Sequence, residues 1–286
     1  MRRRRLAALV AIGLLGAAAL GILTSPVYRA YVLGGPTPIP RGVPQTATRS
    51  AAPVVRPEGP LEIGLASAVA AERADGLVIN RSGRLQVPIG EGLVRPSGPG
   101  VPAGWQLQTF AGQPLVELVR SEIGPAFRIR SEASSFALYR GIVLDLDEYP
   151  VLSWAWKVTR LPGGGDVRHA ATDDQAVQVY VVFPRWPAPR STSEVIGYIW
   201  DTTAPAGARL TSPKAPNVRL VVVESGRESL GVWRRYQRNV RDDYVAAFGH
   251  RPPRVGSVAV MTDGDDTGSL TEALVGDLAF SSPGGR

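Results

Sequence analysis

Three aspartates stand within four positions in the segment 262–268, which reads TDGDDTG. Carboxylates this close together repel one another, and a hard cation with oxygen ligands would relieve the repulsion. Asp263, Asp265 and Asp266 are therefore candidate ligands of a structural Ca²⁺. The loop is not an EF-hand, because Leu274 stands where the bidentate acid would be. Another interpretation stays open, an acidic turn whose side chains cap backbone N–H groups and pair with arginines.

A second acidic pair, Asp173 and Asp174, directly precedes the apolar run 176–183. Adjacent acids before a strand are typical turn formers. The alternative is catalytic: if the fold brings Asp174, Asp243 and Asp263 together, they could serve as acid and base in polysaccharide cleavage. The distance between the carboxylates decides this chemistry, and it has to come from the structure.

The composition excludes most other catalytic centres. The chain has no cysteine, which removes disulfides, thiolate zinc sites and a cysteine nucleophile. Its two histidines, His169 and His250, lie in separate loops flanked by Gly or Pro, so a histidine-based metal centre is not expected. The absence of a nucleophile–base pair favours binding over chemistry.

Lys157 lies in a strand-like run, 152–158, with the sequence LSWAWKV. Alternation with period two puts Trp154 and Trp156 on one face and Lys157 on the other. Two interpretations follow. Either both rings fill the core and Lys157 is merely solvated, or Lys157 contacts a ligand on a concave sheet face.

Tyr198 and Trp200 share a face in the same way, one residue apart. Neighbouring aromatic rings on an exposed sheet suit the apolar faces of sugar rings, with polar neighbours for the hydroxyls. Core packing is the other use for both rings. Under the first interpretation, Trp200 is a ligand-binding residue.

The segment 233–248 has apolar residues at intervals of three and four, followed by Gly and Pro stop signals. This pattern predicts a single amphipathic helix. On its wheel Asn239 and Asp243 fall at the border of the apolar stripe, from which a side chain reaches the sheet edge, whereas Arg238 points to solvent.

Short apolar or alternating runs, separated by turn residues, fill the chain from residue 85 onward, and no helix alternates with them. This pattern predicts an all-β fold, an antiparallel β-sandwich or jelly roll, over residues 85–286. The predicted strands are 115–120, 126–130, 136–144, 151–158, 176–183, 195–200, 218–224, 255–262 and 273–280.

The N-terminal segment has the pattern of a membrane-targeting sequence. Four arginines precede Leu6–Leu23, eighteen residues without a polar side chain, which as a helix would span about 27 Å. Both a retained membrane anchor and a cleaved signal peptide fit residues 1–23. Both place the following chain outside the cytoplasmic membrane, in the cell envelope or secreted.

Residues 24–60 are rich in Pro and Gly and predict an extended tether. For residues 61–84 we expect only a short helix, at 61–74, and we assign the segment no role.

The formal net charge of +7 is concentrated at the N-terminus. Eight arginines precede Glu58, the first acidic residue, and the chain from Glu58 onward carries −1. Nucleic-acid binding by the folded region is therefore not expected, since it needs a surplus of Lys and Arg.

Several motifs follow one another in a fixed order along the chain: Trp154-x-Trp156-Lys157-Val158, Asp173-Asp174, Val179-Tyr180-Val181-x-Phe183, Tyr198-x-Trp200, Ser225-Gly226, Gly231-x-Trp233, Arg238-Asn239-Val240-x-x-Asp243-Tyr244, Phe248-Gly249, Thr262-Asp263-x-Asp265-x-Thr267-Gly268 and Gly276-Asp277. Together these motifs resemble a bacterial family designated domain of unknown function 3047 (DUF3047). The resemblance covers residues 85–280, although Gln178 and Asp266 stand where that family commonly has Arg and Asn. The resemblance implies an exported β-sandwich similar to galactose-binding and carbohydrate-binding jelly rolls, with no activity attached.

The leading hypothesis is a binding module that holds a glycan or another polar cell-envelope ligand on one sheet face. Its predicted ligand contacts are Lys157, Asp174, Trp200, Asn239 and Asp243. A polysaccharide hydrolase or lyase and a purely structural envelope protein are the alternatives. Oligomeric state and ligand identity stay open.

Overall fold

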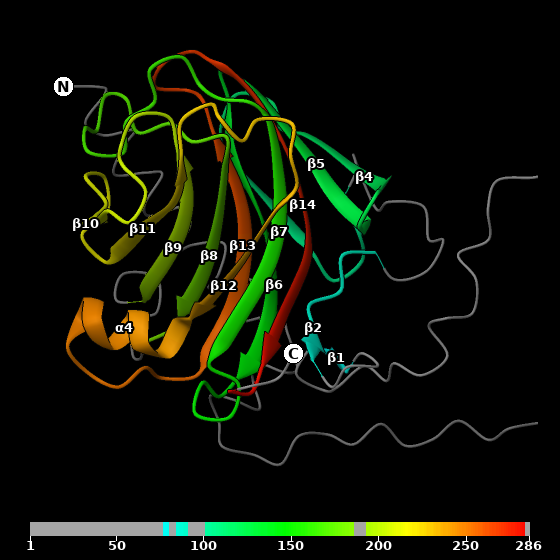
Figure 1. Ribbon diagram of the computed structural model, residues 1–286, viewed down its shortest axis with the longest axis vertical. Coiled ribbons are helices and arrows are strands. Elements are labelled where there is room, and N and C mark those ends of the chain that lie inside the picture. Colours follow the sequence, from blue (N-terminus) through cyan, green and yellow to red (C-terminus); the bar gives the residue numbers. More distant parts are fainter. Residues whose placement is uncertain (1–76, 80–83, 91–100, 186–192, 284–286) are drawn as a thin grey trace, which may run out of the picture.

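The computed structural model of the protein describes residues 77–79, 84–90, 101–185 and 193–283. Two seven-stranded sheets pack against each other as a β-sandwich (Figure 1). Sheet A contains β1 (Val78–Ile79), β2 (Leu85–Gln86), β4 (Leu115–Ser121), β5 (Gly124–Glu132), β7 (Val151–Arg160), β12 (Arg234–Asn239) and β14 (Leu270–Ser281). Sheet B contains β3 (Gln106–Ala111), β6 (Ser135–Leu144), β8 (Val177–Phe183), β9 (Glu194–Asp201), β10 (Arg209–Thr211), β11 (Val218–Ser225) and β13 (Val255–Asp263).

The nine predicted strands are all present, as β4 to β9, β11, β13 and β14. Each is long and apolar enough on at least one face to be recognised from its residues. Five further strands escape prediction: β1, β2 and β10 are only two or three residues long, β12 is predominantly polar, and half of the residues of β3 are polar.

One strand pair departs from the predicted antiparallel arrangement. Strands β9 and β11 are parallel, with Val195 opposite Val218 and Tyr198 opposite Val221. Residues 202–217, which include β10, carry the chain back so that β11 starts at the same end of the sheet as β9. A connection of this length is what a parallel pair requires.

The predicted helix is shorter than the apolar pattern of 233–248. Helix α4 spans Val240–Phe248, and the residues before it form strand β12, which pairs with β7. Asn239 ends the strand and caps the helix, because its side-chain oxygen accepts a hydrogen bond from the Asp242 N–H. Residues 234–239 therefore pair with the open edge of β7 as a strand, although their apolar periodicity is that of a helix.

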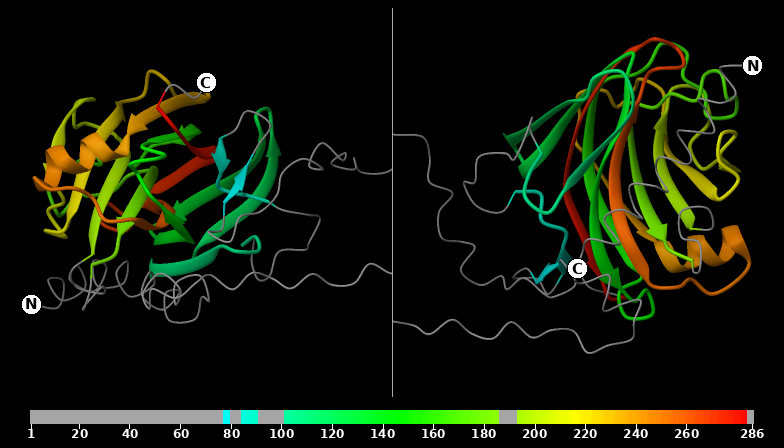
Figure 2. Two further views of the ribbon diagram at one scale, coloured as in Figure 1. Left: turned by 90° about the horizontal axis from the view of Figure 1, so that it is seen from below. Right: turned by 180° about the vertical axis from the view of Figure 1, so that it is seen from behind.

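The core between the sheets is built around aromatic rings. Trp154 of β7 stacks on Tyr198 of β9 with ring centroids 5.1 Å apart, and Trp156 packs against Trp200 at 6.4 Å. All four rings are at most 1% exposed. Figure 2 shows the two layers that these rings join, from below and from behind.

The predicted hydrophobic helix 6–23, tether 24–60 and short helix 61–74 lie outside the described residues. Within the described part, no helix is both long and apolar enough to cross a membrane. Leu77 and Leu85 are buried in the core, so the chain already contributes to the sandwich before the predicted boundary at residue 85.

Candidate functional site

A cluster of five aspartates lies at one end of sheet B, where two of the family-like motifs meet. Alternation along β13 places Met261 and Asp263 on the outer face of the sheet. Residues 173–174 lead into β8, which pairs with β13, and the Asp263 N–H donates to the carbonyl of Gln175 at 2.9 Å. The acidic cluster consists of Asp173, Asp174, Asp263, Asp265 and Asp266.

Asp174 holds the turn that follows β13. It is fully buried, and its oxygens accept hydrogen bonds from the Asp266 N–H at 3.2 Å and the Thr267 N–H at 2.7 Å. The Thr267 hydroxyl donates to the same carboxylate. This is the capping role that the turn interpretation predicts, and it ties the start of β8 to the turn before β14.

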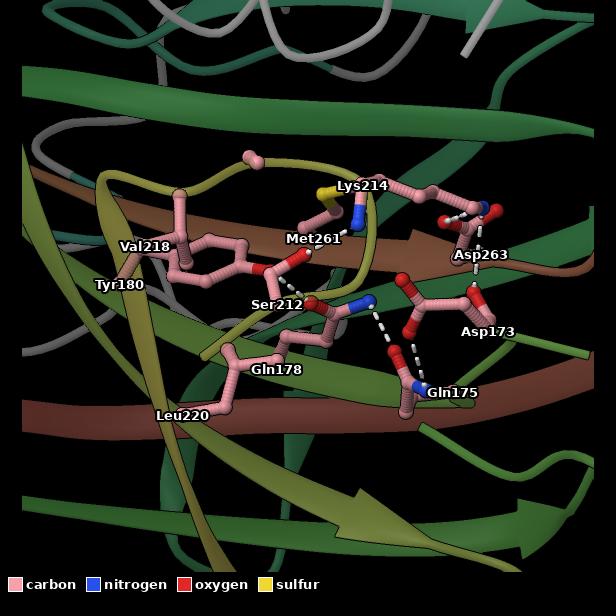
Figure 3. Close-up of a pocket in the computed structure, with 11 residues that line it drawn as sticks. Asp173, Gln175, Gln178, Tyr180, Ser212, Lys214, Val218, Leu220, Met261 and Asp263 are labelled. Atoms are coloured by element: carbon pink, nitrogen blue, oxygen red, sulfur yellow. Dashed lines mark hydrogen bonds and ion pairs between the residues drawn. The ribbon is translucent and has the colours of Figure 1, made fainter. Parts of the chain in front are cut away.

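Lys214, between β10 and β11, places one ammonium group in the acidic cluster (Figure 3). It donates to Asp266 and to the carbonyl oxygen of Asp173, and its Nζ lies 3.9 Å from Oδ2 of Asp263. Burial works to lower the pKa of Lys214, but the charges of Asp263 and Asp173 outweigh it and raise that pKa overall. Lys214 is therefore charged at neutral pH.

Asp263 is the least satisfied member of the acidic cluster. Its Oδ1 is buried and has no hydrogen-bond partner among the described residues. Burial raises the pKa of this carboxyl well above its usual range, Lys214 opposes the rise, and Asp265 and Asp174 add to it. One oxygen from each of Asp174, Asp263 and Asp265 lies within 4.8 Å of the other two.

Beside the acidic cluster, four side chains form a hydrogen-bonded row along β8. Gln175 donates to Asp173 at 3.1 Å, Gln178 donates to Gln175 at 2.8 Å, and the Tyr180 hydroxyl donates to Gln178 (Figure 3). Burial raises the pKa of Asp173 to about 6. The cavity that they line with Lys214 and Asp263 has a volume of about 30 Å³, room for a water or an ion but not for a sugar.

The structure rearranges the predicted set of metal ligands. Asp263 and Asp265 belong to the group of close oxygens, whereas Asp266 is turned to Lys214. The third residue of this group is Asp174, which was predicted to contact the glycan or other polar ligand rather than a metal ion.

A second surface feature lies around Lys157 on the outer face of sheet A. An open hollow of about 370 Å³ there is lined by side chains of β4, β5, β7 and β14 and of the turn after β4. We call it the Lys157 hollow; its lining residues are Val119, Arg120, Ser121, Glu122, Arg128, Lys157, Glu272 and Leu274.

Glu122 connects Lys157 to an indole at the edge of this hollow. Its Oε1 accepts from Lys157 at 2.9 Å and its Oε2 from the Trp233 N–H at 2.7 Å. The Lys157 ammonium also lies 5.9 Å from the centre of the Trp233 ring. The hydrogen bond from Trp233, a backbone hydrogen bond and Lys157 lower the pKa of Glu122 to about 2. Glu122 is accordingly ionised at neutral pH, and it forms an ion pair with Lys157.

Trp200 does not share this surface. Its ring is completely buried and its indole N–H donates to the Gly226 carbonyl at 3.0 Å. The prediction that Lys157 and Trp200 face one ligand is wrong, because the two residues lie on opposite sides of the core: Trp200 on the inner face of sheet B and Lys157 on the outer face of sheet A. Core packing is the interpretation that the structure supports for Trp200.

Asn239 and Asp243 also have structural partners. Asn239 caps α4, as described above. The buried Asp243 carboxylate accepts from Arg238 at 2.9 Å, from Arg209 at 2.8 Å and from the Tyr198 hydroxyl at 3.0 Å. Arg238 therefore points to Asp243 rather than to solvent, and neither Asn239 nor Asp243 joins the acidic cluster or the Lys157 hollow.

Sequence reasoning missed Lys214, Glu122 and Trp233 as site residues. The sequence signal for Lys214 was its rarity, since Lys157 and Lys214 are the only lysines in a chain with thirty arginines. In the structure, Lys214 lies at the acidic cluster and Lys157 at the Lys157 hollow. Glu122 carries no local signal, because its partners Lys157 and Trp233 are far from it in the sequence.

The fold and these sites define a β-sandwich protein with polar sites on both outer faces. The chain belongs to the family described as protein of unknown function, DUF3047, whose sequence pattern matches residues 103–279. The predicted family and fold class are thereby confirmed. No curated protein matches the chain.

Solved structures similar to the chain include several carbohydrate-binding modules. The family 30 module of a Clostridium thermocellum cellulosomal cellulase is 13% identical, with 70% of this chain and 97% of that chain covered and a TM-score of 0.37. TmCBM61, solved with β-1,4-galactotriose, is 10% identical, with coverages of 66% and 100% and a TM-score of 0.32. A loop-swap mutant of Necallimastix patriciarum Xyn11A is 13% identical, with coverages of 64% and 94% and a TM-score of 0.37.

Proposed function

We propose that the protein is an exported binding module whose ligand is a glycan or another polar component of the cell envelope. The observation that carries this proposal is the Lys157 hollow. Its volume of about 370 Å³ falls within the range of roughly 300–1,000 Å³ in which small-molecule sites lie. The cavity beside Asp263 is more than ten times smaller.

The chemistry of the hollow suits a sugar. Lys157 and Arg128 offer hydrogen-bond donors and Glu122 and Glu272 offer acceptors, while Leu274 provides apolar surface for C–H groups. Trp233 lies next to it and is held in place through Glu122. Aromatic and apolar surface beside converging polar groups is the usual composition of a ligand site.

The catalytic alternative loses one of its three carboxylates. Asp243 is engaged by Arg238, Arg209 and Tyr198, and Tyr198 faces the inside of the sandwich. Asp263 faces the outer side of sheet B, so Asp243 cannot form an acid–base pair with it. Of the two that remain, Asp263 lines a cavity too small for a sugar ring, and Asp174 is fully buried and accepts hydrogen bonds from the turn after β13.

Binding is tested by isothermal titration of the full-length protein, in mild detergent, with neutral and uronic-acid oligosaccharides. We expect Lys157→Met, which keeps most of the aliphatic stem, to weaken binding about tenfold or more, because it removes a charged hydrogen bond. Trp233→Ala should weaken it as well, through loss of the ring surface.

Arg130→Met is the matched control for this experiment. Arg130 is on the outer face of β5 and pairs with Glu132 at 3.2 Å, but it does not line the hollow. Its substitution should leave affinity within about twofold. Absence of binding to every sugar, or equal effects of all three substitutions, would refute the proposal.

The exported and membrane-tethered part of the proposal rests on residues 1–23. Cell fractionation followed by alkaline extraction separates a retained anchor from a secreted chain, and the mass of the mature protein reports cleavage. Recovery of the intact chain in the cytosol would contradict export.

A further inference from the structure

The turn between β13 and β14 contains carboxylates that the Lys157 hollow does not use. One oxygen each of Asp174, Asp263 and Asp265 lies within 4.8 Å of the other two. Oxygens on opposite sides of a bound Ca²⁺ are about 4.6–5.2 Å apart, because each lies roughly 2.3–2.6 Å from the ion. The three oxygens are thus close enough together to share one ion of this size.

The buried Oδ1 of Asp263, which lacks a hydrogen-bond partner within the described part of the chain, is a second observation at the same place. The Asp263 side chain is only 5% exposed. Lys214 approaches the other oxygen, Oδ2, at 3.9 Å and makes no hydrogen bond to Oδ1. A buried carboxylate oxygen without a partner is costly, and a cation bound to it would remove that cost.

The charges around the turn are also unbalanced. Among the described residues, Lys214 is the single cation within ion-pair distance of the five aspartates of the acidic cluster. Lys214 contacts Asp266 most closely, which leaves Asp265 and Asp174 without a positively charged partner in that part of the chain. Oδ2 of Asp174 accepts two hydrogen bonds from Thr267, but from the residues that the structure describes Oδ1 accepts only one, from the Asp266 N–H, and has capacity for a further contact.

We propose that Asp174, Asp263 and Asp265 bind a divalent cation, with Ca²⁺ preferred. An all-oxygen donor set selects a hard cation. Ca²⁺ also accepts irregular geometry, whereas Mg²⁺ demands near-ideal octahedral coordination at shorter distances. The ion would fasten the turn that joins sheet B to sheet A onto the residues that lead into β8, a role that does not depend on the glycan proposal.

The test is a titration of the full-length protein, stripped with EDTA, with CaCl₂ and separately with MgCl₂ at pH 7.5. Saturating Ca²⁺ should raise Tm by roughly 5 °C at a hundredfold excess over Kd, because the ion binds only the folded state. Asp265→Asn preserves the shape of the side chain and removes one ionic ligand, so Ca²⁺ affinity should fall at least about tenfold.

Asp266→Asn is the matched control, because Asp266 is the neighbouring acid that pairs with Lys214 instead. It should alter Ca²⁺ affinity by less than about threefold. Equal losses in the two variants would overturn the assignment of Asp265 and attribute the effect to bulk charge. Far-UV circular dichroism verifies that each variant is folded, and Asp263→Asn provides a second ligand substitution if Asp265→Asn does not fold.

A shared proton between Asp263 and Asp265 is the competing explanation of the same geometry. It predicts no heat of binding and no change in Tm up to about 10 mM Ca²⁺, above the range of weak extracellular calcium sites. That result overturns the proposal. A stronger response to Mg²⁺ than to Ca²⁺ would overturn the preference for Ca²⁺.

Discussion

At the scale of single residues, Glu122 is the side chain of the Lys157 hollow whose charge depends most directly on its neighbours. Its pKa is lowered from 4.5 to about 2, by Trp233 first, then by a backbone hydrogen bond and Lys157. Because the folded state favours the ionised form, this stabilisation is complete above pH 4.5 and is lost as the pH falls toward 2. We expect an NMR titration of the Glu122 carboxyl carbon to give a midpoint of about 2.

Substitution of Trp233 by Phe should raise that midpoint toward 4.5, because the indole N–H is the largest single cause of the shift. Lys157→Met removes both a hydrogen bond and a nearby positive charge and should raise the midpoint as well. A native midpoint of 4.5 would show that the contacts of Glu122 with Trp233 and Lys157 are absent in solution.

Single residues also show where sequence reasoning stops. Alternation along β7 places Trp154 and Trp156 opposite Lys157, and the structure agrees. The same rule states that Tyr198 and Trp200 share a face, but alternation does not tell which face is covered by the other sheet. That depends on packing between strands far apart in the sequence, such as the contact of Trp156 with Trp200.

At the scale of secondary-structure elements, α4 is attached to the sandwich through its buried residues Val240, Asp243 and Tyr244. The Asp243 carboxylate accepts hydrogen bonds from two arginines and the Tyr198 hydroxyl. Burial works to raise its pKa, but the hydrogen bonds and charge of Arg238, together with Arg209 and Tyr198, outweigh burial and lower that pKa overall. Asp243→Asn should destabilise the protein by about 2–4 kcal/mol, because it leaves partly buried arginines without a charged partner. Urea unfolding measures this difference.

Asp242→Asn is the control on the same helix. The Asp242 side chain is 67% exposed and its pairing with Arg241 is weak, at 4.0 Å, so the change should stay within about 0.5 kcal/mol. If the two substitutions cost the same, the charge at the start of α4 matters and the contact with β9 does not.

Elements were predictable where local pattern and tertiary environment agree. Strands such as β8 and β13 are buried along their whole length and read as apolar runs. Strand β12 has the sequence RRYQRN, which has little strand character by itself, and it becomes a strand because the edge of β7 supplies hydrogen-bond partners. The same dependence on a distant partner explains why the parallel pairing of β9 and β11 was not foreseen.

At the scale of the whole molecule, the aromatic core joins the two sheets, and the two proposed sites lie on opposite outer faces of the sandwich. Trp154 of sheet A contacts Tyr198 of sheet B, and it also stacks on Tyr236 of β12 at 5.6 Å. The turn of the proposed cation site also leads directly into β14, whose Glu272 and Leu274 line the Lys157 hollow, so β14 connects the two sites in addition to the aromatic core.

The shared core predicts that both sheets unfold in one cooperative transition. Trp154→Leu removes ring contacts on both sides of the core and should lower stability by roughly 3 kcal/mol, moving the melting curves seen by far-UV and near-UV circular dichroism together. Val232→Ala, at a side chain that is 54% exposed, should change stability by less than about 0.5 kcal/mol. Two separate transitions, or a shift confined to one probe, would mean that the sheets are stabilised independently and that Trp154 does not couple them.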